Sequence, residues 1–173
     1  MKAWLNEHLY QALNKDHLTG LLAKPRFDEE FERALEAARA RGEPLGIIMA
    51  DVDNLKEIND EHGHLVGEFA VGEIGRIIGS FQDENRRATC FGGDEYQVIL
   101  PGEGNAAAVE MAELIRRNVE GRAFEREGVT FDPTLSLGVA AYPSSGPATK
   151  DLTRAADRAL YRTKQTDGNT VGE

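Results

Sequence analysis

The sequence predicts an α+β fold in which helices pack on a mostly antiparallel sheet. A continuous apolar run of strand length, residues 45–50, is typical of a central strand buried on both faces. Two runs rich in β-forming residues, 88–91 and 96–100, are joined by two glycines and two acids, which predicts a β-hairpin. The order helix, strand, hairpin, helix, strand, helix then favours a layer of helices on an antiparallel sheet.

Composition indicates one globular domain. The 173 residues are 40% hydrophobic and 29% charged, which is enough to bury a sizeable core. A net charge of −10 repels phosphate backbones and acidic membranes, so no nucleic-acid or membrane partner is expected. The single cysteine excludes an intramolecular disulfide, and no signal peptide or membrane-spanning stretch is visible. We expect a cytoplasmic protein, or the cytoplasmic part of a larger one.

The first 15 residues predict a connecting helix. Apolar residues recur there at helical spacing, at Trp4, Leu5, Leu9, Ala12 and Leu13. This stripe either packs on its own domain or continues a coiled-coil stalk from an upstream sensory module. The expected division is therefore 1–15 as connecting helix, 16–169 as the domain and 170–173 as a tail.

The remaining helices and strands follow from periodicity in chain order. Residues 25–41 form an amphipathic helix with Pro25 near its start and Gly42 after its end. A short helix over 53–60 precedes a longer one over 69–81, and another helix covers 106–119. Residues 134–142 predict a strand, and a last helix from 152 carries Lys164 near its end.

Carboxylates stand at the ends of two of these elements. Asp51 closes the buried strand, and Asp94 and Glu95 occupy the hairpin tip beside Gly92 and Gly93, where glycine lets a ligand approach bare backbone. In isolation, such a tip is most simply turn chemistry with solvated acids. If the strand lies beside the hairpin, Asp51 and Asp94 converge as an acid pair suited to two-metal phosphoryl or nucleotidyl transfer.

Several motifs follow one another in a fixed order and spacing along the chain. They are Asp16-His17-Leu18-Thr19-Gly20-Leu21, Asp51-Val52-Asp53-Asn54-Leu55-Lys56-Glu57-Ile58-Asn59-Asp60, Gly63-His64-Leu65-Val66-Gly67, Gly92-Gly93-Asp94-Glu95-Tyr96, Ser136-Leu137-Gly138-Val139-Ala140 and Ala159-Leu160-Tyr161-Arg162-Thr163-Lys164. Together they resemble one family, the GGDEF domains or diguanylate cyclases, over residues 16 to about 169.

The resemblance implies a ferredoxin-like, palm-type fold and a diguanylate cyclase that condenses two GTP into cyclic dimeric GMP (c-di-GMP) with release of pyrophosphate. It implies two Mg²⁺ (or Mn²⁺) ions per active site, a homodimer that is at least transient, and an upstream sensory domain. The implied metal ligands are Asp51, the carbonyl of Val52, and Asp94, with Glu95 helping at the metals or at the ribose hydroxyl. Implied substrate-binding residues are Lys56, Asn59, Glu68, Gly92, Gly93 and Lys164.

Departures from the family pattern leave alternatives open. Tyr96 replaces the usual Phe, and Ala23-Lys24 replaces Asn-Arg. Glu68 replaces the Asp that accepts hydrogen bonds from guanine, and Gly168 stands where an Arg would contact the triphosphate. The first alternative is a degenerate GGDEF module that binds GTP, or another nucleotide, without turnover and has a regulatory or interaction role. A second is a nucleotidyl cyclase or polymerase palm that uses another base.

The product-inhibition site of the family is also altered. Many members carry R-x-x-D five residues before Gly-Gly, and this chain has Asp83-Glu84-Asn85-Arg86, with acid and base exchanged. Asp83 would repel the phosphates of the product, so we expect the inhibition site to be missing.

Overall fold

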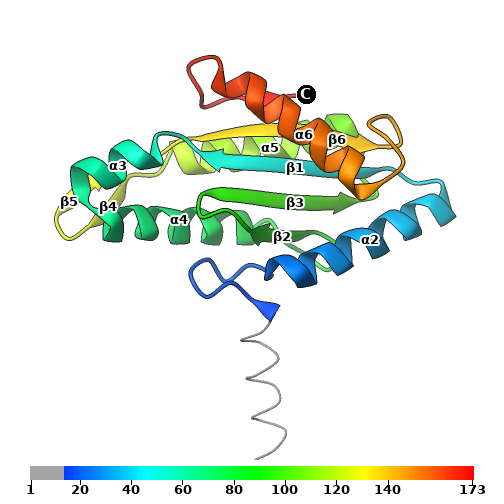
Figure 1. Cartoon of the computed structure of the whole chain (residues 1–173), viewed down its shortest axis with the longest axis horizontal. Helices are drawn as coiled ribbons and strands as arrows, with labels where there is room; N and C mark the ends of the chain where they lie inside the picture. Colours follow the sequence, from blue (N-terminus) through cyan, green and yellow to red (C-terminus); the bar gives the residue numbers. More distant parts are fainter. Residues whose placement is uncertain (1–13) are drawn as a thin grey trace, which may run out of the picture.

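A five-stranded sheet forms the centre of the molecule (Figure 1). The structure is a computed structural model and describes residues 14–173. Strand order is β2-β3-β1-β6-β7, and β1 pairs antiparallel with both β3 and β6 while β7 joins β6 in parallel. The strands are β1 (Leu45–Val52), β2 (Arg87–Cys90), β3 (Glu95–Pro101), β6 (Leu135–Tyr142) and β7 (Val171–Gly172). The predicted α+β fold and mostly antiparallel sheet are confirmed.

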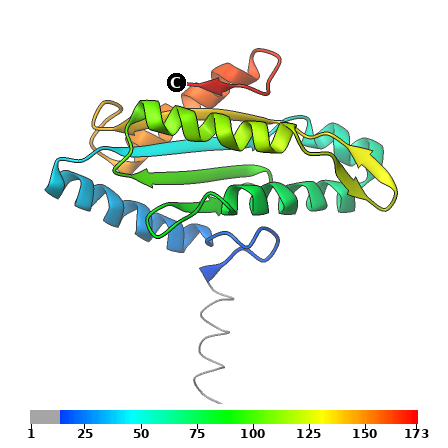
Figure 2. The ribbon, with the colours of Figure 1, turned by 180° about the vertical axis from the view of Figure 1, so that it is seen from behind.

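Helices cover both faces of this sheet (Figures 1 and 2). Buried side chains of α2 (Lys24–Arg41) and α6 (Thr149–Lys164) pack on one face, where the core includes Leu45, Ile47 and Met49 of β1. Those of α4 (His64–Gly79) and α5 (Asn105–Glu120) pack on the other face, against Ile48, Ala50 and Val52. The short helix α3 (Leu55–His62) connects β1 to α4.

The continuous apolar sequence of β1 follows from this position. Successive side chains of a strand point to opposite faces, and here both faces are covered by helices. Ile47 and Ile48 are each fully buried, although they face opposite layers. Asp51 comes where the helical layers no longer cover the strand completely, so the acid reaches the edge of the core.

Two elements were not predicted from the sequence. The strands β4 (Phe124–Arg126) and β5 (Val129–Phe131) form a separate two-stranded hairpin. Its turn, Glu127 and Gly128, has positive φ angles of 54° and 81°, as a two-residue hairpin turn requires. The other element is β7, which lies within residues 170–173, where a tail was expected.

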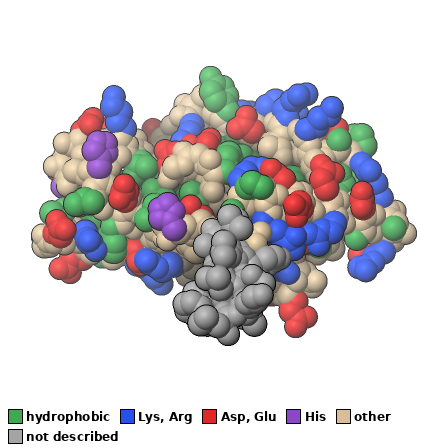
Figure 3. Space-filling view, turned by 60° about the horizontal axis from the view of Figure 1, so that its bottom comes forward, with side chains coloured by type: hydrophobic (Ala, Val, Ile, Leu, Met, Phe, Trp, Pro, Cys, Tyr) green, Lys and Arg blue, Asp and Glu red, His purple; other side chains and the backbone are tan. Residues whose placement is uncertain are grey.

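The connecting helix expected over residues 1–15 lies almost wholly outside the described residues. From residue 14 onward, no helix is both long enough and apolar enough to cross a membrane. Acidic and basic side chains are interspersed on the face seen in Figure 3, so the excess negative charge of the chain does not form one acidic surface there.

Candidate active site

The pairing of β1 with β3 brings the predicted acids to one end of the sheet. Asp51 lies opposite Glu95 in the register of the two strands. The backbone N–H of Val52 donates a hydrogen bond to the carbonyl of Asp94 at 3.1 Å. Asp51, Asp94 and Glu95 therefore come from segments more than forty residues apart and meet at the end of the central strand.

The two glycines shape the hairpin tip that carries these acids. Gly93 has a φ of +82°, a conformation that favours glycine. A Cβ atom on Gly92 would collide with the carboxylate of Glu95, which folds back over the glycine. The N–H of Phe91 donates to the carbonyl of Glu95 at 3.0 Å and closes the turn. The predicted hairpin is confirmed, and its glycines leave room for the Glu95 side chain.

The acids of this site disfavour one another's ionisation. Burial raises the pKa of Asp51 and outweighs its interaction with Lys164, and the charges of Asp94 and Asp53 raise it further. Burial also raises the pKa of Glu95, and the neighbouring Asp51, Asp94 and Asp157 add to this effect. A bound cation would relieve both the burial cost and the repulsion.

Lys164, the last residue of α6, forms an ion pair with the side chain of Asp51. A cavity of about 430 Å³ opens beside this pair and is also lined by Glu95, Asp157 and Arg158. Sequence analysis missed Asp157 and Arg158. The signal was available for Asp157, which lies seven residues before Lys164 and so shares its side of the helix.

The donor atoms fit Mg²⁺ in chemistry, although no cage of side chains is preformed. Within residues 14–173, no three His, Cys, Asp or Glu side chains gather into a metal-binding cluster. Mg²⁺ commonly keeps several waters and is held by one or two carboxylates together with substrate phosphates. The carboxylates of Asp51 and Asp94 and the carbonyl of Val52 supply such hard oxygen donors, so the residues present fit this ion.

Asp53, the second acid after β1, points into a different network. Its carboxylate accepts hydrogen bonds from the hydroxyls of Thr134 at 2.8 Å and Ser136 at 2.7 Å. It also accepts one from the backbone N–H of Asn169 at 3.0 Å. Asp53 thereby joins the end of β1 to the start of β6 and to the loop that follows Lys164.

The residues expected to hold the base lie at the corner between α3 and α4. The side-chain oxygen of Asn59 is buried and has no hydrogen-bond partner within residues 14–173. A Cβ atom on Gly67 would collide with that side chain, so the glycine makes room for it. Glu68 is exposed and lines a separate cavity of about 220 Å³, and Lys56 is exposed on α3. None of these three contacts the acids directly.

The family profile described as "Diguanylate cyclase, GGDEF domain" matches residues 13–170. The chain belongs to the GGDEF family. Diguanylate cyclase A of Treponema denticola is 33% identical over 169 residues, which cover 96% of this chain and 46% of that protein. An uncharacterized signaling protein of Caulobacter vibrioides is 38% identical over 152 residues, covering 87% and 19%. The chain therefore spans less than half the length of these curated relatives.

A solved structure agrees with the assignment. The GGDEF domain of DgcB from Caulobacter crescentus, crystallised in complex with c-di-GMP, has a TM-score of 0.86 to this chain at 29% identity. The match covers 92% of each chain.

Two departures from the GGDEF pattern have structural explanations. Tyr96 is completely buried, and its hydroxyl donates to the carbonyl of Val71 at 2.7 Å, so the extra polar atom is satisfied. Gly168 has a φ of +70°, and a Cβ atom there would lie 3.1 Å from the carboxylate of Asp53. The loop after Lys164 therefore favours glycine at this position, where an Arg side chain would be strained.

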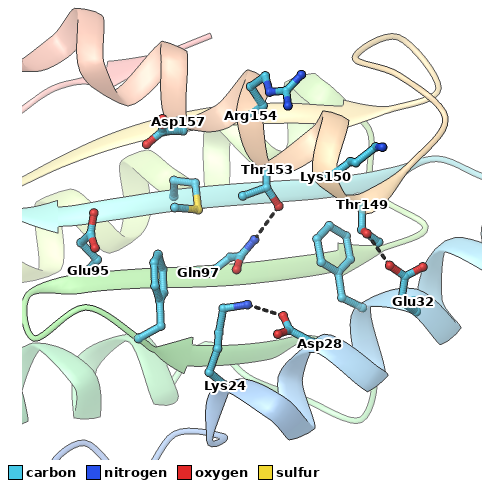
Figure 4. A pocket seen from close by; sticks show the side chains of 13 residues that line it. Lys24, Asp28, Glu32, Glu95, Gln97, Thr149, Lys150, Thr153, Arg154 and Asp157 are labelled. Carbon is cyan, nitrogen blue, oxygen red and sulfur yellow. Dashed lines mark hydrogen bonds and ion pairs between the residues drawn. The ribbon is translucent and has the colours of Figure 1, made fainter.

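A further cavity, of about 640 Å³, lies between α2, the sheet and α6 (Figure 4). Gln97 is 1% exposed on its floor, and the side-chain nitrogen donates to the hydroxyl of Thr153 at 3.1 Å. Glu95 and Asp157 line this cavity as well as the one beside Lys164. The two spaces therefore share one acidic wall, next to the hairpin tip.

Proposed function

We propose that this GGDEF domain is a diguanylate cyclase that condenses two GTP molecules into c-di-GMP. In each half of the reaction, a ribose 3′-oxygen forms a bond to the α-phosphorus of the other GTP, and pyrophosphate leaves as that phosphorus loses its bond to the bridging oxygen. The observation that carries the proposal is the meeting of Asp51, Asp94 and Glu95 at the end of β1, beside Lys164.

Asp51, Asp94 and the carbonyl of Val52 would hold the Mg²⁺ ions, two per site in the proposed scheme. When bound, these ions lower the pKa of the 3′-hydroxyl and stabilise charge on the phosphate oxygens. Glu95 would help at the metals or take the hydroxyl proton, since it lies opposite Asp51 and next to Asp94 at the hairpin tip.

The remaining residues position GTP. Lys164 would leave Asp51 when metal binds and contact the phosphates, while Lys56 approaches them from α3. Gly92 and Gly93 allow the phosphates to lie close to the backbone. Asn59 offers its unpartnered buried oxygen to a donor on the guanine, and Glu68 offers a carboxylate to the N1–H and amino groups of that base.

The assembly follows from the chemistry. Each domain holds one GTP, and the product joins two, so two domains must face each other in a homodimer that is at least transient. An upstream sensory domain would control that encounter, and the curated relatives are more than twice as long as the part that this chain covers. The proposed substrate implies a cytoplasmic location.

The site for product inhibition is missing in this proposal. The side chain of Asp83 accepts hydrogen bonds from the backbone N–H groups of Asn85 and Arg86, both at 2.8 Å. Arg86 in turn donates to Glu103 at 2.6 Å. Asp83 is thus bound within its own loop and Arg86 is paired with the loop after β3, and the exposed Asp83 would repel a phosphate.

The decisive experiment incubates the protein with GTP and Mg²⁺ and detects c-di-GMP by mass spectrometry. The parent should form the product, and Asp51→Asn and Asp94→Asn should not, while all keep the same melting temperature within a few degrees. Asp132→Asn is the matched control, because Asp132 is exposed and outside the site. Product formation at the parent rate by Asp94→Asn would refute the assignment.

One observation favours the alternative of a GTP-binding module without turnover. Lys164 is already ion-paired with Asp51, and Gly168 provides no cation where the family has an Arg. Under this alternative, GTP would raise the melting temperature of the parent, yet no c-di-GMP would form at any enzyme concentration.

A further inference from the structure

The cavity beside Glu68 also contains two arginines that sequence analysis did not consider. Its walls come from α4, from the β4–β5 hairpin, which lies beyond the main sheet, and from Leu18 in the loop before α2. Lining residues are Leu18, Leu65, Glu68, Phe69, Gly72, Arg76 and Arg126. The cavity therefore combines one carboxylate with two guanidinium groups and an apolar lining.

Of the two arginines, Arg126 is free to bind a ligand. Arg76 is ion-paired with Glu73, one helical turn before it on α4. The guanidinium of Arg126 lies over the ring of Phe69, 5.5 Å from its centroid. Its one ion pair, with Glu127 at 3.8 Å, is loose, and no hydrogen bond within residues 14–173 involves its side chain. Phe69 thus holds a planar set of N–H donors that make no hydrogen bond within the part of the chain that the structure describes.

Glu68 and Arg126, both in the described part of the chain, line the same cavity, and they do not form an ion pair with each other. A ligand that presents donors next to acceptors would satisfy both. The edge of guanine has this pattern, because N1–H and the 2-amino group are donors while O6 and N7 are acceptors. Arginine paired with O6 and N7 is the commonest specific contact to guanine.

We propose that Arg126 is a specificity-determining residue that donates hydrogen bonds to O6 and N7 of the guanine whose donor edge is bound by Glu68. The inference rests on the proposed use of GTP and adds a second base-reading element from the β4–β5 hairpin. Leu65, which is 63% exposed at the cavity rim, supplies an apolar surface for one face of the base.

The same pair disfavours adenine. Adenine has an unprotonated N1, which would face the carboxylate of Glu68, and an amino group at position 6, which would face the guanidinium of Arg126. An acceptor would then face an acceptor at Glu68, and a donor would face a donor at Arg126. Unpaired polar groups of this kind discriminate strongly against a wrong base.

The test measures binding of nucleotides by calorimetry, with Ca²⁺ in place of Mg²⁺ so that turnover does not consume the ligand. The ligands are GTP, 7-deaza-GTP, which lacks only the N7 acceptor, and inosine triphosphate, which lacks only the 2-amino donor. The proteins are the parent, Arg126→Ala, Arg126→Lys and the control Arg122→Ala, an exposed arginine just before the hairpin. Melting temperatures verify that each variant is folded.

Arg126→Ala should weaken GTP binding by roughly tenfold to a hundredfold, the range for loss of a bidentate contact to a base. The parent should prefer GTP over 7-deaza-GTP, and Arg126→Ala should bind the two alike. The preference for GTP over inosine triphosphate should be unchanged in Arg126→Ala, because Glu68 reads the amino group. Arg126→Lys keeps the charge without the planar fork and should recover only part of the affinity.

Unchanged GTP affinity in Arg126→Ala, or equal binding of GTP and 7-deaza-GTP by the parent, would overturn the inference and leave the proposed function standing. Absence of GTP binding by the parent would overturn both. A uniform loss of affinity for all three nucleotides in Arg126→Ala would also overturn it, since that pattern indicates a general charge effect.

Discussion

Removal of the Asp53 carboxylate should destabilise the domain, although Asp53 touches no substrate in the proposed scheme. The Asp53→Ala substitution deletes the acceptor of three hydrogen bonds, from Thr134, Ser136 and the backbone of Asn169. Hydrogen bonds to a charged group contribute about 1.5–3 kcal/mol each. Bonds within one network are not additive, so we expect a total loss of about 3 kcal/mol in the free energy of unfolding.

Thermal and urea unfolding measure this loss directly. For a domain of this size, about 1 kcal/mol corresponds to about 2–4 °C, so the melting temperature of Asp53→Ala should fall by about 6–12 °C. Asp53→Asn keeps one acceptor oxygen and should lose about half as much. The exposed Asp132→Ala is the control and should melt like the parent.

A double-mutant cycle tests the mechanism behind the loss. Ser136→Ala should destabilise the parent but cost about 1 kcal/mol less in the Asp53→Ala background, because its hydrogen bond is already gone. If Asp53→Ala melts within a degree of Asp132→Ala, or if the two substitutions are additive, the Asp53 network does not hold β1 to β6.

Three more predictions concern the site. The pKa values of Asp51 and Glu95 are raised above the usual 3.8 and 4.5, so the folded metal-free domain favours their protonated forms. The free energy of unfolding of this domain should therefore decrease as the pH rises through the raised values. Mg²⁺ requires the ionised forms, so the rise in melting temperature that it produces should become smaller as the pH falls through the raised values and be absent in Asp94→Asn, whereas a pH-independent rise would indicate another metal site. Glu68→Asp restores the usual acceptor of the GGDEF family and should lower the KM for GTP; equal use of ATP and GTP by the parent would show that guanine is not read. Micromolar c-di-GMP should leave the initial rate unchanged, since Arg86 is paired with Glu103; noncompetitive inhibition that disappears in Arg86→Ala would contradict this.

Elements with a strong local pattern could be predicted from the sequence. The apolar run of β1 reflects burial on both faces, and the glycines at 92 and 93 mark the hairpin tip that brings Glu95 opposite Asp51. Both signals depend on residues close together in the chain. The convergence of Asp51 and Asp94 was predicted only on the condition that β1 lies beside the hairpin, because neither run alone encodes which strands pair.

The β4–β5 hairpin and the role of Asp53 could not be predicted in this way. Strands of three residues are too short to show an alternating pattern. Asp53 bonds to Thr134 and Ser136, which are 81 and 83 residues away and reach it only because β1 pairs with β6. Such contacts belong to the assembled sheet, and no local window of the sequence contains them.

The separation of the β4–β5 hairpin from the main sheet has a consequence for how this domain can change. Phe124 and Phe131 fix the hairpin to the core with rings 5.8 Å apart, whereas Arg126 and its turn face solvent. The acids at the end of β1 share no strand and no hydrogen bond with it. If Arg126 reads the base as proposed, substitutions at this position would alter which nucleotide is accepted without touching the acids at the end of β1, so new base preferences would evolve without a loss of chemistry.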